Sequence, residues 1–358
     1  MAADIFVVDP HLHRTSNNFN FLRLLFALLV ILSHTVEILD GNRDREIFTI
    51  LFHTTTFGGL AVDGFFLLSG YLIVQSWKAD PVAWTFLSKR ALRIFPAFIV
   101  ASVLCAFIVG PLGGGKDYFE QFKLVDFLVG MGLLAKPAIP PVFAGSHFPM
   151  VNGSMWSIHY EFVCYLFVLG FGLSRALRNP RVWLFATAAL VVVNTAHAWG
   201  LQFSLLSLRD PLANPLVRLS MFFFVGGSFY LYRHVIVFRR RDAGIAAALL
   251  LPALYSEATL DLGLALAGGY LLFYFALTSL AGLHWFRRLP DVSYGTYLYG
   301  WPVTKLLIWY FPSISAVAAV GLTMLAALML GAVSWYGVEK PFLKLKPGNH
   351  RQPALVPA

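Results

Sequence analysis

Five ionisable side chains lie in apolar stretches long enough to cross a membrane: Arg23, His34, Asp63, Glu161 and Lys305. A charged group at that depth is costly unless it has a partner or faces a cavity. Histidine exchanges protons near neutral pH, and a carboxylate can orient its ring, so these residue types suit general base catalysis. Each also has an ordinary alternative, because basic side chains snorkel to the interface and a buried histidine can be a packing residue.

Arg23 and His34 share the apolar run 19–39 and are eleven residues apart. On an α-helix this spacing is close to three turns, which puts both side chains on one face, separated by roughly 16 Å along the axis. One helix is therefore expected to present a cation and an imidazole to the same cavity at different depths.

Glu161 is the middle residue of a polar stripe, because Ser157, Glu161 and Tyr165 follow one another at four-residue spacing. Such residues lie on one face of a helix. A carboxylate in this setting needs a partner. A structural salt bridge to Arg23 or Arg90 and the orientation of a catalytic histidine both remain open.

Asp63 lies in a run whose glycines permit close helix approach, namely Gly58, Gly59, Gly64 and Gly70. Close packing explains the glycines but not the carboxylate. Asp63 is therefore the second candidate, beside Glu161, for accepting the other ring proton of His34.

Arg90 and Arg93 are three residues apart and therefore share a helix face. At the inner mouth of a bundle they can pair with the phosphates of a cytosolic polyanion through charge-assisted hydrogen bonds. The ordinary alternative is the excess of basic residues in cytoplasmic loops.

The composition excludes a soluble monomer, since 58% of the 358 residues are hydrophobic and only 13% are charged. The predicted fold class is all-α, a polytopic transmembrane bundle of about ten spans. The stretch Leu124 to Ala135 is too short to cross and is expected to be re-entrant or interfacial. The ten predicted spans are 19–39, 58–77, 95–112, 153–173, 182–200, 216–237, 243–256, 259–281, 295–312 and 314–337.

The basic residues predict the orientation, because eighteen fall in one set of loops and six in the other. Both termini are then cytoplasmic, and the net charge of +9 reflects topology rather than nucleic-acid binding. The predicted organisation is a cytoplasmic segment 1–18, a transmembrane domain 19–337 and a cytoplasmic tail 338–358. Two isolated cysteines, Cys105 and Cys164, do not indicate a metal site.

Several short motifs, in the same order along nearly the whole chain, resemble those of the acyltransferase-3 family. The first is the Arg23-to-His34 spacing. The others are Phe65-Phe66-x-x-Ser69-Gly70, Arg90-x-x-Arg93-Ile94-x-Pro96, Trp156-Ser157-x-x-x-x-Glu161, Ser293-Tyr294-x-x-Tyr297-Leu298 with Trp301-Pro302, and Trp335 with Glu339-x-Pro341. Each motif is weak alone, but together they make the resemblance specific.

The resemblance implies a multi-pass protein of the bacterial inner membrane that transfers an acyl group, commonly acetyl, from acyl-CoA to a hydroxyl of a cell-surface glycan or lipid-linked sugar. His34 would be the catalytic base and Arg23 the charged partner in its motif, on the donor side. Arg90 and Arg93, together with Ser69, would bind the donor. Acetyl-CoA is then a co-substrate, and no tightly bound cofactor is expected.

The acceptor is expected to contact Trp156, Tyr165 and Tyr297. One position departs from the family pattern: many members carry a histidine where this chain has Gly300. A role assigned to that histidine cannot be transferred, which leaves His34 as the better candidate base.

A secondary transporter or flippase of a glycan or lipid-linked substrate is the alternative, because ionisable residues within spans also build proton relays. The sequence lacks the internal repeat common among transporters. It does not identify the acceptor, the acyl chain length or the oligomeric state.

Overall fold

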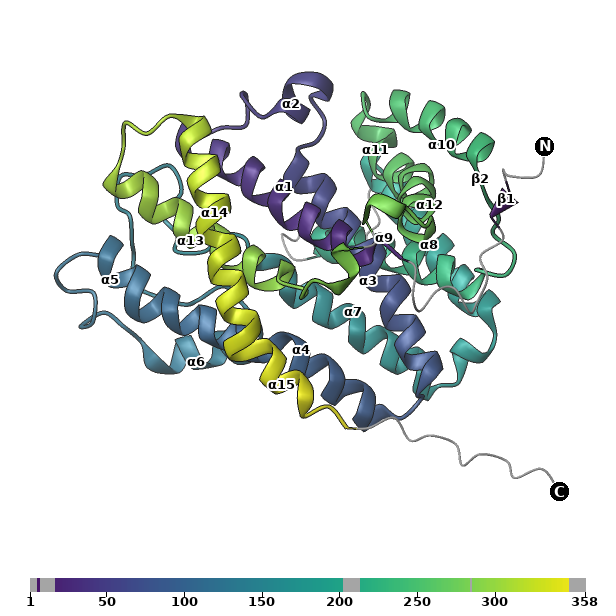
Figure 1. Ribbon diagram of the computed structural model, residues 1–358, viewed down its shortest axis with the longest axis horizontal. Coiled ribbons are helices and arrows are strands. Elements are labelled where there is room, and N and C mark those ends of the chain that lie inside the picture. The colour runs from purple at the N-terminus through teal and green to yellow at the C-terminus, as the bar shows by residue number, and fades with distance from the viewer. Residues whose placement is uncertain (1–4, 7–16, 202–212, 284, 348–358) are drawn as a thin grey trace.

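A computed structural model describes residues 5–6, 17–201, 213–283 and 285–347 (Figure 1). This part of the chain is mainly helical, as predicted. Its one sheet is an antiparallel pair of two-residue strands, β1 (Ile5–Phe6) and β2 (Phe238–Arg239). The α-helices are α1 (Phe19–Asp40), α2 (Ile47–Phe52), α3 (Phe57–Ala79), α4 (Ala83–Leu104), α5 (Gly110–Gly113), α6 (Leu124–Gly132), α7 (Trp156–Leu173), α8 (Pro180–Ala198), α9 (Ala213–Leu231), α10 (Arg240–Ala253), α11 (Glu257–Gly263), α12 (Gly269–Leu277), α13 (Ser293–Tyr310), α14 (Ala316–Ser334) and α15 (Lys340–Lys344).

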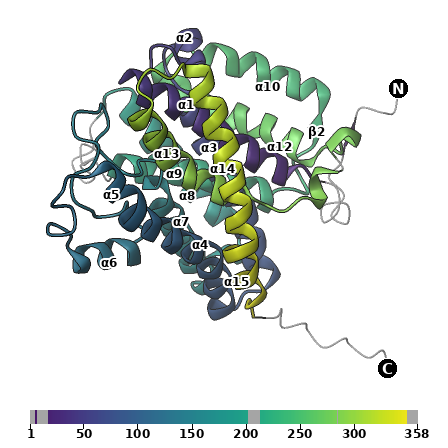
Figure 2. The same ribbon diagram turned by 60° about the vertical axis from the view of Figure 1, so that its left-hand side comes forward.

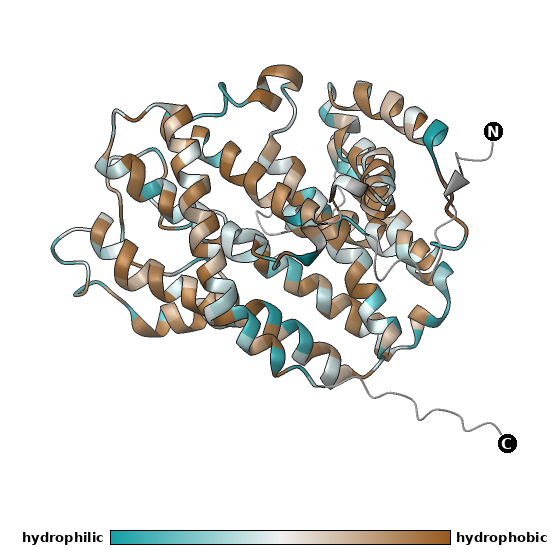
Figure 3. Cartoon of the chain, in the orientation of Figure 1, coloured by the Kyte–Doolittle hydropathy of each residue, from teal (hydrophilic) through white to brown (hydrophobic). Residues whose placement is uncertain are grey.

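Seven helical stretches of the described chain are long and apolar enough to cross a membrane: Phe19–Asp40, Phe57–Ala79, Ala83–Gly113, Trp156–Leu173, Pro180–Ala198, Glu257–Leu277 and Ala316–Lys344. Figure 3 shows mostly hydrophobic residues along these helices, and large apolar side chains such as Val317 and Phe185 are exposed by 85% and 74%. Such surfaces are suited to lipid. The count of ten spans and the cytoplasmic termini stay predictions, and most of the segments 1–18 and 338–358 lies outside the described residues.

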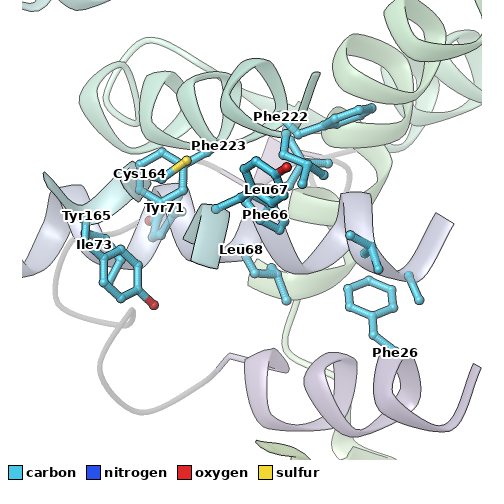
Figure 4. Close-up of a cluster of buried hydrophobic side chains, with 14 of the residues drawn as sticks. Phe26, Phe66, Leu67, Leu68, Tyr71, Ile73, Cys164, Tyr165, Phe222 and Phe223 are labelled. Carbon is cyan, nitrogen blue, oxygen red and sulfur yellow. The ribbon is translucent and has the colours of Figure 1, made fainter. Parts of the chain in front are cut away.

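Helix α3 forms the centre of the bundle and packs against α1, α7 and α9. Its buried side chains Phe66, Leu67 and Leu68 belong to the main hydrophobic core, which also contains Phe222 and Phe223 of α9 (Figure 4). The predicted close approach of α3 is confirmed at Gly70. A Cβ atom there would lie 1.9 Å from the carbonyl oxygen of Phe223, so only glycine allows this contact.

Three helical stretches of the described chain contain a π-helical turn. Cys105–Val109 joins α4 to α5, Leu264–Gly268 joins α11 to α12, and Trp335–Glu339 joins α14 to α15. Figures 1 and 2 show α14 and α15 as one rod whose C-terminal end lies beside α4. The Trp335–Glu339 turn buries Glu339, which is 1% exposed, against α4. The short stretch predicted at 124–135 forms the separate helix α6, which packs on α4.

Candidate active site

A cavity of about 300 Å³ lies within the bundle between α1, α3, α4, α7 and α13, and the C-terminal segment covers part of it. One part of its lining is strongly charged, and another part is formed by hydroxyl-bearing and aromatic side chains. The lining residues are Arg23, Val62, Phe65, Phe66, Ile73, Arg90, Arg93, Ile94, Ser157, Ile158, Glu161, Tyr165, Asp291, Ser293, Tyr294, Tyr297, Leu343 and Lys346.

Arg23 and Arg93 are held in the cavity wall by carboxylates. Both donate to Oδ2 of Asp291, from Nη1 of Arg23 at 3.0 Å and Nη2 of Arg93 at 2.6 Å. Arg93 also donates to Glu339 at 3.2 Å. Burial would raise the pKa of Asp291, but Arg93 and Arg23 outweigh it and lower that pKa to about 2. Asp291 therefore stays ionised and fixes both guanidinium groups.

Arg90 has no such partner, although it lies one turn from Arg93 on α4. Its only hydrogen bond within the described ranges is a long one, 3.5 Å, to the Ser76 hydroxyl, and its buried Nε donates to nothing there. Its guanidinium lies 6.0 Å from the ring centre of Phe86. A buried donor without a partner is costly, so Arg90 is available for an anionic ligand.

Glu161 accepts hydrogen bonds from two hydroxyls, those of Ser69 at 2.8 Å and Tyr165 at 2.6 Å. The predicted polar stripe is confirmed, because Ser157, Glu161 and Tyr165 all line the cavity. A salt bridge from Glu161 to Arg23 or Arg90 does not form; among the described contacts, hydroxyls satisfy this carboxylate instead.

Tyr297 of α13 also lines the cavity. Its hydroxyl lies 2.7 Å from that of Ser157 and donates to the backbone carbonyl of Ser154. These contacts join α13 to the start of α7. One turn further along α13, the ring of Trp301 packs on His34, with 5.0 Å between ring centres. The cavity and His34 are therefore about one helical turn apart.

His34 pairs with Glu37 on the next turn of α1, a residue that the sequence reasoning missed. His34 Nδ1 and Glu37 Oε2 are 3.0 Å apart, and Arg43 donates to the other carboxylate oxygen at 2.9 Å. Because an ionised carboxylate only accepts, Nδ1 carries the proton and Nε2 keeps its lone pair. The expectation that Glu161 or Asp63 orients His34 is therefore wrong, since Glu37 holds that position on the same helix.

Asp63 belongs to a different cluster. It accepts from Nη2 of Arg218 at 2.7 Å, and Arg218 Nε donates at 3.0 Å to Asp261, which also accepts from Asn194. The four side chains connect α3, α9, α11 and α8. Asp63 is not among the residues that line the cavity, so its geometry assigns it to helix packing rather than to the predicted catalytic group.

Two further predicted residues lie outside the cavity lining. Trp156 is half-buried and contacts the ring of Tyr160. Lys305 is buried, donates to the Ser146 hydroxyl at 2.8 Å and lies over the ring of Phe143. Neither contact bears on an acceptor or on acid-base chemistry.

Gly300 lies where α13 crosses α1. A Cβ at this position would be 2.6 Å from Cγ1 of Ile31, one turn before His34. The histidine that many family members carry here therefore does not fit without a shift of α1 or α13.

Three charged residues of the site were not singled out as site residues from the sequence: Glu37, Asp291 and Lys346. Glu37 has a usable signal, because it follows His34 by three residues and therefore shares its helix face. Asp291 and Lys346 lie in connecting segments, outside any periodic pattern. Only the folded chain brings them to Arg23 and Arg90.

Comparison with known proteins covers nearly the whole chain. The acyltransferase domain model matches residues 16–336. An O-acetyl transferase of Shigella phage Sf6 is 28% identical over 92% of this chain and 96% of its own length. Nodulation protein 10 of Rhizobium leguminosarum bv. viciae is 29% identical over 94% and 96%.

Acyltransferase MdmB of Streptomyces mycarofaciens is 30% identical over 48% of this chain and 43% of its own length. No solved structure matches. The family is one of enzymes, which favours acyl transfer over the transporter alternative. Its domain covers the helices that build the cavity and the His34 pair: the chain is a multi-pass membrane acyltransferase of the acyltransferase-3 family.

Proposed function

We propose that this enzyme transfers an acyl group, acetyl in the simplest case, from acyl-CoA to a hydroxyl of a cell-surface glycan or lipid-linked sugar. The observation that carries the proposal is the arrangement along α1 and α13. The cavity contains Arg90, an arginine without an ion pair. His34, which is oriented by Glu37, lies about one helical turn beyond the cavity.

The charged wall suits the donor. Coenzyme A carries several phosphate charges, and guanidinium groups bind phosphate through paired, charge-assisted hydrogen bonds. Arg90 supplies the unpaired guanidinium, while Asp291 holds Arg23 and Arg93 beside it. The helical rise of α1 separates Arg23 from His34 by about 16 Å, which an extended pantetheine arm can bridge.

The chemistry takes place at His34. Its Nε2 removes the proton of the acceptor hydroxyl as the oxygen attacks the thioester carbonyl carbon. The carbon–sulfur bond then breaks, the acyl group remains on the acceptor oxygen, and the thiolate of coenzyme A receives the proton. Glu37 holds the ring and stabilises the imidazolium, and Arg43 holds Glu37.

The acceptor is proposed on two grounds. A relative that matches nearly the whole chain is named an O-acetyl transferase, which points to a hydroxyl. The excess of basic residues in one set of loops supports a topology in which the charged wall faces the cytoplasm and His34 lies toward the outer side of a bacterial inner membrane. A donor from the cytosol and a glycan from the outside would then meet between them.

Mass spectrometry of surface glycans from cells with and without the gene tests the proposal. We expect the loss of a mass increment of one acyl group when the gene is removed, and its return with the wild-type gene but not with His34→Ala. The protein purified in detergent should transfer label from radioactive acetyl-CoA. Unchanged glycans together with no acetyl-CoA turnover would contradict the assignment.

A further inference from the structure

The C-terminal segment forms part of the cavity wall although it lies beyond the matched residues 16–336. Leu343 of α15 and Lys346, just after it, both line the cavity. The π-helical turn at the end of α14 directs Glu339 to Arg93, and α15 packs on α4. This contact fixes the segment beside the charged wall.

Lys346 joins a group of cations there. Burial and the nearby Arg90, Arg93, Lys89 and Arg23 lower its pKa to about 8, because each opposes another positive charge. Lys89 is paired with Asp80 at 3.0 Å, and Asp291 holds both Arg23 and Arg93. Within the described ranges, the side chain of Lys346 has no ion pair or hydrogen bond, although its backbone N–H donates to the carbonyl of Leu343.

The imbalance of charge in the lining points to an anion. Four cations line the cavity, Arg23, Arg90, Arg93 and Lys346, against the carboxylates Glu161 and Asp291. Asp291 is shared by two arginines, and hydroxyls satisfy Glu161. Arg90 and Lys346 are thus left facing the same space without an ion pair among the described residues, an arrangement that a multiply charged anion stabilises.

We propose that Lys346 binds a phosphate of the acyl donor together with Arg90, so that the C-terminal segment is a functional wall of the donor site. The inference rests on the proposed function, because it takes coenzyme A as the donor. A phosphate can also come from an anionic lipid headgroup, since Lys346 lies just beyond a candidate membrane span that ends at Lys344.

Lys344 offers a matched control. It lies two residues earlier in the same segment and carries the same charge, but it is exposed and does not line the cavity. The experiment measures acetyl-CoA binding to the full chain, purified in detergent without added lipid. We expect Lys346→Gln to raise the Kd by about tenfold, the effect of one charge-assisted hydrogen bond, and Lys344→Gln to leave it nearly unchanged. Lys346→Arg keeps the positive charge and should recover most of the affinity that Lys346→Gln loses.

Three outcomes decide between the alternatives. Wild-type protein that binds no acetyl-CoA would overturn the proposed function itself. Binding by wild type that Arg90→Gln weakens but Lys346→Gln does not would overturn only the role of Lys346. A Lys346→Gln effect that appears only in vesicles with anionic lipid, and not in zwitterionic vesicles or detergent, would assign Lys346 to a headgroup and contradict the proposal. Thermal unfolding of each variant confirms that the fold is intact.

Discussion

Nδ1 of His34 lies 3.0 Å from Oε2 of Glu37, one turn away on the same helix. Because both residues belong to α1, the contact depends on helix geometry alone and is in place before any substrate binds. Arg43 holds the second carboxylate oxygen at 2.9 Å, which prevents Glu37 from turning away. The pair has the arrangement of a general base and its orienting group.

His34→Ala is expected to lower kcat for acyl transfer by about a hundredfold or more, because the acceptor hydroxyl loses its base. Donor binding should be retained, since His34 is outside the cavity lining. Glu37→Gln should lower kcat less and shift the pH dependence of kcat, because the amide no longer stabilises an imidazolium. Transfer by the purified His34→Ala variant at the wild-type rate would show that another group is the base.

Substitutions of Arg90 and Arg93 should have different effects: the first should weaken donor binding, and the second should lower the stability of the fold. Arg90→Gln is expected to raise the acetyl-CoA Kd by about tenfold with little change in the unfolding temperature, because Arg90 holds no carboxylate. Arg93→Gln leaves Asp291 and Glu339 with one partner fewer and should destabilise the fold by about 3 kcal/mol. Acetyl-CoA titration and thermal unfolding in detergent measure both. Equal effects of the two substitutions on binding alone would contradict this division.

Helix periodicity predicted the parts of the site that lie on single helices. The shared face of Arg23 and His34 requires only that residues 19–40 form one helix, as they do. The stripe of Ser157, Glu161 and Tyr165 follows from the same rule on α7. Such relations depend on local geometry, which apolar periodicity specifies strongly.

Contacts between helices were beyond sequence reasoning, because pairing depends on how the helices pack. Glu161 and Asp63 are both carboxylates within spans, and the residue types do not distinguish a hydroxyl partner from Arg218, which lies 155 residues after Asp63. Asp291 and Lys346 could not be identified from helix periodicity, since both lie outside the helices. The predicted count of ten spans also depends on short helices such as α10, whose length alone does not show whether they cross the membrane.

Asp63→Asn should affect stability and not donor binding. The substitution weakens the ion pair with Arg218, and removing one partner of a buried pair is costly. We expect a lower unfolding temperature with an acetyl-CoA Kd within about twofold of wild type, since Asp63 lies outside the cavity lining. A Kd raised as strongly as by Arg90→Gln would mean that Asp63 contributes to donor binding and would contradict its assignment to helix packing.

Gly300→Ala should lower acyl-transfer activity because it displaces His34, and not because it weakens donor binding. The new Cβ meets Ile31, one turn before His34 on α1, and overpacking of this kind costs about 1–3 kcal/mol. Ile31→Ala removes the atoms in conflict, so the double variant should recover activity relative to Gly300→Ala alone. This double-mutant cycle tests the contact directly. Purely additive losses would show that Gly300 acts elsewhere.

Donor affinity should depend on pH through Lys346. Burial and the neighbouring cations, Arg90 first, lower the pKa of Lys346 to about 8, so the ammonium is charged below that pH and neutral above it. The acetyl-CoA Kd is expected to be constant below about pH 7 and to rise above about pH 8. Lys346→Arg should abolish the rise, because a guanidinium stays charged throughout this range.

The surrounding groups sharpen the pH test. The cations beside Lys346 are Arg90, Arg93, Arg23 and Lys89, of which Lys89 is paired with Asp80, and the carboxylates Glu161 and Asp291 face the same cavity. Lys344→Gln, which changes an exposed charge, should keep the wild-type profile. Lys346→Arg removes only the titration of Lys346. If the Kd of this variant has the same pH dependence as that of wild type between about pH 7 and 9, the charge of Lys346 does not contribute to donor binding.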